Sequence, residues 1–258
     1  DSLLKKYVHW NAAGVASQVD YAGFKRDKRQ LNQYRKIGFE QYKIKLSGNY
    51  KDDKSRLDLL RDNNKNPQIR LDANNLWDKK ETVVDYIRSL NQSIVALEEP
   101  LTPGQYDDLR HVSLELEMPI ILDESFCSRA QFIPIIDSVN NWILNIRMSK
   151  MGGLIRSLGI IETAKYYDIP IIIGAHVGET SLLTRAGLVA AQAAQGSLIG
   201  QEGGFGTYLL KYDICDEPLQ FAQAGKLNLD IQNESNPGFG IKVNNFQEGY
   251  QKRASNIR

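Results

Sequence analysis

Cysteine, histidine, net charge and long apolar runs are all scarce in this sequence of 258 residues. Its two cysteines are too few for a disulfide framework and fit a reducing, cytoplasmic compartment. The three histidines are far apart and no Cys/His cluster has the spacing of a zinc site, so we expect no zinc centre. With 32 basic and 31 acidic residues the formal charge is +1, which gives no reason to expect nucleic acid or an anionic membrane as a partner. No apolar run approaches the roughly 18 residues that a membrane-spanning helix requires.

Short β-branched runs alternate with longer stretches of helical periodicity along most of the chain. Strands that are apolar throughout are typical of a parallel sheet that is buried on both faces. Eight such units in a chain of this length favour a single α/β barrel over an open sheet. The predicted strands are residues 7–10, 41–46, 68–72, 94–98, 119–123, 142–147, 170–175 and, with a weaker pattern, 197–200.

Ionisable residues stand at the ends of the predicted strands and recur every 25 to 27 residues. The carboxyl ends of parallel barrel strands meet at one face, where enzymes of this architecture carry their catalytic residues. One acid after a strand is more often a helix cap than a ligand, but three acids on successive units between two lysines predict a common site. The recurring residues are Lys45, Asp72, Glu98, Asp123, Lys150, His176 and Glu202.

The stretch ALEEPL, residues 96 to 101, contains two adjacent carboxylates, Glu98 and Glu99. Because side chains alternate along a strand, the two point to opposite faces and only one can reach the common site. Glu98 keeps the spacing of the other ionisable residues. We therefore expect Glu98 at the site and Glu99 in a structural or supporting position.

Three converging carboxylates repel one another and need a cation to stay ionised in a partly buried site. Asp72, Glu98 and Asp123 offer oxygen ligands only, which suit Mg²⁺ or, as the alternative, Mn²⁺. Lys43 and Lys45 lie on the same face of one strand, so we expect each to lower the pKa of the other.

Lys150 belongs to the unit four places further along the barrel and approaches the site from the opposite side. One lysine can remove the α-proton of a carboxylate substrate, and the other can return a proton on the opposite face or hold charge. A metal ion bound to the carboxylates would stabilise the negative charge that develops when the proton leaves. The residues thus predict metal-dependent proton transfer.

These motifs resemble the barrel domain of the enolase superfamily, in particular the muconate-lactonizing-enzyme subgroup of the mandelate racemase and muconate lactonizing enzyme family. The resemblance covers about residues 5–245 and is carried, in order, by GFEQYKIKLSG, RLDANNLWD, ALEEPL, ILDESF, NIRMSKMGGL and PGFGIKV. It implies a TIM-like (β/α)7β barrel, with residues 1–258 as a single domain, PGFGIKV as its closing strand and residues 246–258 as a tail. The α+β capping domain of the family is mostly N-terminal to the barrel, and we expect it to be absent from this chain, which begins DSLLKK without an initiator Met.

The resemblance also implies roles for individual residues. Lys45 and Lys150 match the two catalytic lysines and Lys43 a helper, while the three acids match the metal ligands. The superfamily is known to combine such bases with Mg²⁺ and an enediolate. His176 stands where the mandelate-racemase subgroup has a catalytic histidine, but the sixth strand ends in Lys150 instead of the partner aspartate, so we expect His176 to be a polar wall residue. Residues expected to bind substrate or support the site are Asn74, Glu124, Arg147, His176, Glu179 and Glu202.

We therefore predict a Mg²⁺-dependent isomerase or lyase that removes the α-proton of a small carboxylate: a cycloisomerase, a racemase or epimerase, or an o-succinylbenzoate synthase-like dehydratase. A Schiff-base barrel aldolase acting through Lys150 is an alternative, but it leaves the three carboxylates unexplained. A non-catalytic binding barrel is another, although an intact set of lysines and acids counts against it. The sequence chooses neither the substrate nor the oligomeric state, although members of the family often form homo-oligomers.

Overall fold

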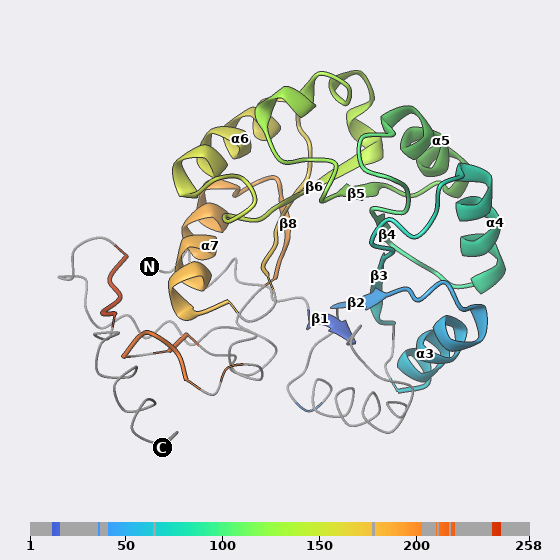
Figure 1. Ribbon diagram of the computed structural model, residues 1–258, viewed down its shortest axis with the longest axis horizontal. Helices are drawn as coiled ribbons and strands as arrows, with labels where there is room; N and C mark the ends of the chain where they lie inside the picture. The colour runs from blue at the N-terminus through green and yellow to red at the C-terminus, as the bar shows by residue number, and fades with distance from the viewer. Residues whose placement is uncertain are drawn as a thin grey trace, which may run out of the picture.

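The protein contains one parallel β-sheet of eight strands in the order β1 to β8. The computed structural model describes residues 12–15, 36, 41–63, 66–176, 179–202, 210, 212–216, 218–219 and 239–243. Figure 1 shows the strands in an arc with the helices outside it. The strands are β1 (Ala12–Val15), β2 (Gln41–Lys45), β3 (Gln68–Asp72), β4 (Ala96–Glu98), β5 (Ile120–Leu122), β6 (Trp142–Ile146), β7 (Ile171–Ile173) and β8 (Leu198–Gln201).

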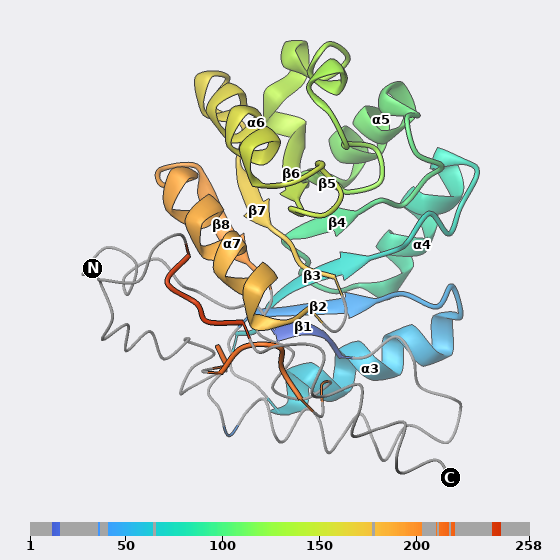
Figure 2. The same cartoon turned by 60° about the vertical axis from the view of Figure 1, so that its left-hand side comes forward.

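Helices connect consecutive strands from β2 onward, as a parallel sheet requires. Their apolar residues recur at helical spacing, so that each helix buries one face against the sheet; α4, for example, buries Val83, Val84, Ile87 and Leu90. Figure 2 shows the same succession of strands and helices in a turned view. The helices are α3 (Tyr50–Asn63), α4 (Lys80–Leu90), α5 (Tyr106–Leu116), α6 (Leu154–Tyr166) and α7 (Ser181–Ala193), with two 3-10 helices, η2 (Arg129–Phe132) and η3 (Ile136–Asn141), between β5 and β6.

The predicted strands agree with the structure from the second strand onward, within two residues at each end. The first prediction, residues 7–10, lies outside the described residues. Strand β1 was missed because its sequence, AAGV, has little of the β-branched and aromatic content that marks a strand. Of the expected closing strand PGFGIKV, the described residues include an isolated antiparallel bridge between Val243 and Cys215. The predicted tail, residues 246–258, also lies outside the described residues.

Alternation along the strands separates two apolar layers. Outward-facing residues such as Tyr42, Ile44 and Leu71 join the main core between sheet and helices. Inward-facing residues form a small second cluster, made of Ala96, Ile121, Ile143 and Ile172. Two residues further along β4, β5 and β6 the inward-facing positions become polar. This change from apolar to polar along the inner face places the candidate site at the carboxyl ends of the strands.

Strand pairing among the described residues runs from β1 to β8, and none of these pairings joins β8 back to β1. The parallel α/β arrangement predicted from the sequence is therefore confirmed, while complete (β/α)7β closure stays a prediction. Within the part of the chain that the structure describes, no helix is both long enough and apolar enough to cross a membrane.

Candidate active site

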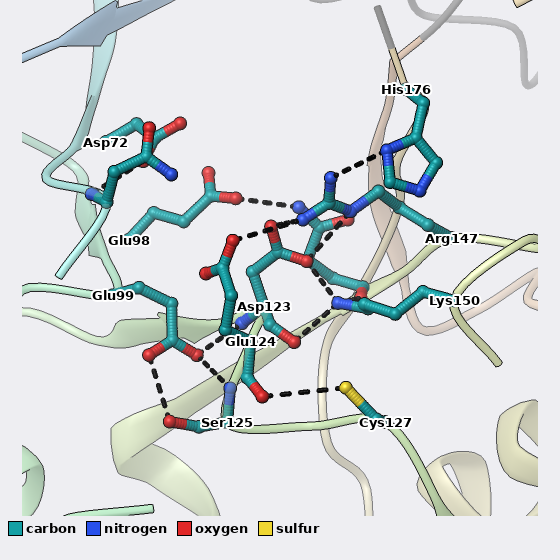
Figure 3. A network of polar contacts seen from close by, with 12 residues as sticks. Asp72, Glu98, Glu99, Asp123, Glu124, Ser125, Cys127, Arg147, Lys150 and His176 are labelled. Carbon is teal, nitrogen blue, oxygen red and sulfur yellow. Dashed lines mark hydrogen bonds and ion pairs between the residues drawn. The ribbon is translucent and has the colours of Figure 1, made fainter. Parts of the chain in front are cut away.

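The residues predicted from the sequence lie at the carboxyl ends of β2 to β8, along the inner face of the sheet. Parallel register sets them side by side: Lys45 pairs with Asp72, and Asp72 pairs with Glu98. Asp123 directly follows β5, and Lys150 lies in the turn after β6. Figure 3 shows the acids and Lys150 gathered with Arg147 in one polar network.

Lys43 is the centre of the cluster on the β2 side. Its Nζ lies 3.1 Å from Oε2 of Glu202 and 3.3 Å from Oε2 of Glu98. The distance from Nζ to Oδ2 of Asp72 is 3.8 Å. Burial lowers the pKa of Lys43, but these three carboxylates outweigh it and raise the pKa above the ordinary value. The expectation of a lowered pKa for Lys43 is therefore wrong, because the charges nearest to its ammonium group are negative.

The acids around Lys43 do not behave alike. Burial, followed by the nearby charge of Glu98, raises the pKa of Asp72 to about 6. Burial also acts to raise the pKa of Glu202, but Lys43 and Arg70 reverse the effect and hold it below the ordinary value. Arg70 Nη2 lies 3.0 Å from Oε1 of Glu202, which is buried. Glu202 thus stays ionised between two cations, and Asp72 is the carboxylate with too little positive charge around it.

Asp123 is held by two cations on the β6 side. Arg147 Nε donates a hydrogen bond to its Oδ1 at 2.9 Å, and the Arg147 guanidinium and the Lys150 ammonium both form ion pairs with the carboxylate. Lys150 also donates to the backbone carbonyl of Asn145. Burial, and after it the positive charge of Arg147, lower the pKa of Lys150 to about 8. A lysine with such a pKa can exchange protons near neutral pH.

Asn145 orients the middle acid. Its Nδ2 donates a hydrogen bond of 2.8 Å to Oε1 of Glu98, and both side chains are buried. Gly174, directly after β7, leaves the space that Asn145 needs: a methyl group there would fall on Asn145 Oδ1 and lie 2.8 Å from Cγ of Arg147. The absence of a side chain at position 174 therefore allows two site residues to lie where they do.

Glu99 points away from Glu98, as strand alternation predicted. Its Oε1 accepts hydrogen bonds from the backbone N–H groups of Asp123 (2.7 Å) and Ser125 (2.6 Å), and its Oε2 accepts one from the Ser125 hydroxyl. Burial raises the pKa of Glu99 to about 8, although the hydrogen bonds from Ser125 act in the opposite direction. Glu99 thus fixes the backbone of Asp123 from behind the site.

The other predicted residues form a looser rim. Glu124 Oε1 lies 3.5 Å from Nη2 of Arg147, and His176 Nδ1 lies 3.3 Å from Nη1 of the same guanidinium. Glu179 accepts a hydrogen bond from the backbone N–H of His176 at 2.7 Å. Asn74 has an exposed side chain, and its backbone N–H donates to Oδ1 of Asp72.

Three carboxylates from adjacent strands have the donor chemistry that Mg²⁺ prefers. Glu98 Oε2 fits this role further, because it is buried and, apart from its ion pair with Lys43, has no hydrogen-bond partner among the described residues. Among the described residues, however, no three His, Cys, Asp or Glu side chains converge closely enough to hold a metal ion as they stand. Each acid is already paired with a cation of the chain: Lys43 with Asp72 and Glu98, and Arg147 and Lys150 with Asp123. The metal assignment of Asp72, Glu98 and Asp123 therefore stays a prediction, and it requires Asp123 to be released from its cations.

Two residues of the site were missed in the sequence, Arg70 and Asn145. Each stands on a strand two residues before a predicted site residue, Asp72 and Arg147 respectively, and so faces the same way. A polar residue two positions before a predicted site residue, and so on the same face of its strand, was the signal that could have identified both.

Comparisons with known proteins show the family of the chain. The Enolase C-terminal domain-like family model matches residues 26–247, so the chain belongs to that family. It is 26% identical over 213 residues to N-succinyl-L-Arg/Lys racemase of Bacillus cereus, an alignment that covers 80% of this chain and 54% of the relative. It is 25% identical over 217 residues to o-succinylbenzoate synthase of Bacillus subtilis, covering 84% of this chain and 56% of the relative.

Solved structures show the same fold. A dipeptide epimerase of Cytophaga hutchinsonii, complexed with Mg and the dipeptide D-Ala-L-Val, has a TM-score of 0.77 at 21% identity, covering 94% of this chain and 63% of that one. A muconate lactonizing enzyme has a TM-score of 0.76 at 22% identity, covering 95% of this chain and 65% of that one. The chain thus spans just over half the length of the two curated relatives and about two thirds of these structures.

Proposed function

We propose that the protein is a Mg²⁺-dependent isomerase or lyase that removes the α-proton of a small carboxylate substrate. The observation that carries the proposal is the arrangement of bases and acids at the strand ends. Asp72, Glu98 and Asp123 lie on consecutive strands, with the lysines of β2 on one side and Lys150 on the other. An aldolase would need one of these lysines and none of the acids.

Lys45 and Lys150 are the proposed bases. Lys45 ends β2, half-buried and beside Asp72 in register, and Lys150 has a pKa lowered to about 8. Because they approach from opposite sides, each would remove the α-proton from one enantiomer, and the lysine on the other side would deliver the proton that forms the opposite enantiomer. Lys43, held protonated by its carboxylates, supplies fixed positive charge rather than a base.

A divalent cation bound to the three acids would stabilise the negative charge that develops on the substrate carboxylate. The chain's own residues prepare for this charge: Asn145 holds Glu98, and Glu99 holds the backbone of Asp123. Arg147 would exchange its contact with Asp123 for a contact with an anionic part of the substrate, which the guanidinium can bind through two parallel hydrogen bonds.

Racemisation or epimerisation of an N-acylated amino acid or a dipeptide is the reaction that we favour. The lysines on both sides suit a proton transfer that proceeds in either direction, and the relatives include a racemase of N-succinyl amino acids and epimerases of dipeptides. Muconate cycloisomerisation and o-succinylbenzoate synthesis use the same fold and remain as the other members of this proposed class.

The experiment is α-proton exchange in deuterated water, followed by proton NMR with the full-length protein and Mg²⁺. The panel contains N-succinyl amino acids, dipeptides and muconate-like acids, each amino acid as both enantiomers. We expect exchange that chelation abolishes. Lys45→Ala and Lys150→Ala should each reduce exchange of the enantiomer that the missing lysine serves by at least about a hundredfold, within the range that general bases contribute. Exchange of both enantiomers that survives in each of the two variants would contradict the proposal, and borohydride trapping insensitive to chelators would favour the aldolase instead.

A further inference from the structure

The turn after β2 is bound to helix α3 by one carboxylate, that of Asp53. This side chain is fully buried, and it accepts hydrogen bonds from three groups of the turn. The backbone N–H of Ser47 lies 3.0 and 3.1 Å from its two oxygens, the Ser47 hydroxyl lies 2.8 Å away, and the N–H of Gly48 lies 3.1 Å away. The turn begins directly after Lys45, so its conformation determines how β2 ends.

Asp53 accepts hydrogen bonds from a tyrosine hydroxyl and from an arginine that also contacts the strand end. The Tyr86 hydroxyl donates to its Oδ2 at 2.6 Å, and Arg56 Nη1 donates to its Oδ1 at 3.3 Å. The same Arg56 nitrogen donates to the backbone carbonyl of Lys45 at 3.2 Å. One guanidinium nitrogen thus joins the buried carboxylate to the residue proposed as a base.

The peptide group after Lys45 is held from both sides. Its carbonyl oxygen accepts from Arg56, and its N–H, which belongs to Leu46, donates to the backbone carbonyl of Asp72 at 2.8 Å. The first contact comes from outside the sheet and the second from the neighbouring strand. Further along α3, Asp58 instead forms a half-exposed ion pair with Lys54, and none of the contacts described for its side chain reaches the end of β2.

We infer that Asp53 and Arg56 are positioning residues that fix the backbone of Lys45, and thereby the direction from which its amine reaches the substrate. The inference rests on the proposed function of Lys45 as one of two bases. It predicts an asymmetric defect, because Lys150 is held by Asp123 and Asn145 and has no contact with Asp53 or Arg56 among those described. A residue that merely stabilises the fold would impair both bases equally.

The test measures α-proton exchange of both enantiomers of the panel substrate that wild type exchanges fastest, beginning with N-succinyl-arginine. Lys45→Ala identifies the enantiomer that Lys45 serves. In the full-length protein, Asp53→Asn and Arg56→Met should reduce exchange of that enantiomer by about tenfold or more, since small misplacements of a reacting group cost up to about a hundredfold. Exchange of the other enantiomer should change by less than about twofold, which is small beside the loss of up to about a hundredfold that misplacing a reacting group can cause. The Mg²⁺ affinity should also change by less than about twofold.

Two further variants make the outcome decisive. Arg56→Met retains the apolar stem of a partly exposed side chain, so it tests the inference if Asp53→Asn fails to fold. Asp58→Asn, on the same helix, is the matched control and should leave both enantiomers unchanged. An equal loss for both enantiomers, or no loss for either, would overturn the inference.

Failure of the proposed function is distinguishable, because wild type would then exchange no member of the panel. In that case amide hydrogen exchange of Ser47 and Gly48 decides whether the turn depends on this contact. Faster amide exchange in Arg56→Met than in both wild type and Asp58→Asn would support the positioning of the strand end, and unchanged amide exchange would refute it.

Discussion

Gly174→Ala is expected to damage the site without touching any proposed ligand or base. The new methyl group would fall on Oδ1 of Asn145 and lie 2.8 Å from Cγ of Arg147. Asn145 is buried and cannot swing into solvent, so its amide must leave the 2.8 Å hydrogen bond to Glu98. The substitution therefore disturbs the orientation of Glu98 while the Glu98 side chain itself is retained.

The size of the effect follows from these contacts. Overpacking a buried position costs about 1–3 kcal/mol of unfolding free energy. Loss of a hydrogen bond to a charged group costs about 1.5–3 kcal/mol, part of which the same rearrangement already includes. Loss of a group that orients a metal ligand weakens metal binding by about 10- to 100-fold. We expect a fall of about 2–3 kcal/mol in stability together with this loss of Mg²⁺ affinity.

Urea unfolding and calorimetric Mg²⁺ titration of the full-length protein measure the two quantities. Gly159→Ala is the matched control: nothing lies within 4 Å of the added methyl group, and the residue is inside helix α6, so stability should rise by about 0.5–1 kcal/mol with no change in Mg²⁺ affinity. In an Asn145→Ala background, Gly174→Ala should cost less, because the principal clash is gone. Unchanged Mg²⁺ affinity in Gly174→Ala would refute the role assigned to Asn145.

Three further predictions test separate parts of the account. Glu98→Gln should weaken Mg²⁺ binding by at least about tenfold in calorimetry, whereas Glu99→Gln should preserve it, since the amide oxygen can still accept from Asp123 and Ser125; equal losses would refute the different roles of the two acids. Burial and the hydrogen bond to Asp53 raise the pKa of Tyr86 above its ordinary value of about 10. The folded state therefore holds this proton more tightly, so stability should fall as pH rises above about 10, and Tyr86→Phe should remove that part of the slope in urea unfolding; an identical slope would contradict it. Phe126→Ala removes a buried ring in the loop after β5, and it should lower the unfolding free energy by about 3–5 kcal/mol; a loss below about 1 kcal/mol would show that this ring is not packed as described.

The parallel sheet could be predicted because both of its signals are local. Apolar strands and helical periodicity alternate along the chain, and residues such as Asp72 and Glu98 end their strands at a regular interval. Parallel register then sets these residues side by side with no further information. Strand β1 escaped prediction because AAGV lacks that local signal.

The electrostatics of the site could not be predicted in the same way. Lys43 was expected to have a lowered pKa because Lys45 is two residues away. Glu202, 159 residues further along the chain, instead raises the pKa of Lys43, because its carboxylate lies 3.1 Å from the ammonium group. Asp123 was expected to face a metal, and its contacts with Arg147 and Lys150 depend on the turn after β6. Sequence spacing gives the strand end on which a charge stands, but the three-dimensional contacts determine which charges meet.

The central claim is that two lysines work from opposite sides of a site that requires a divalent cation. The most direct test is deuterium exchange at the α-carbon of separate enantiomers, with the full-length protein in the presence of Mg²⁺. Lys45→Ala should abolish exchange of one enantiomer and leave that of the other largely intact, and Lys150→Ala should do the reverse. The account would be contradicted if one variant lost exchange of both enantiomers while the other variant lost neither, because a single lysine would then carry the chemistry.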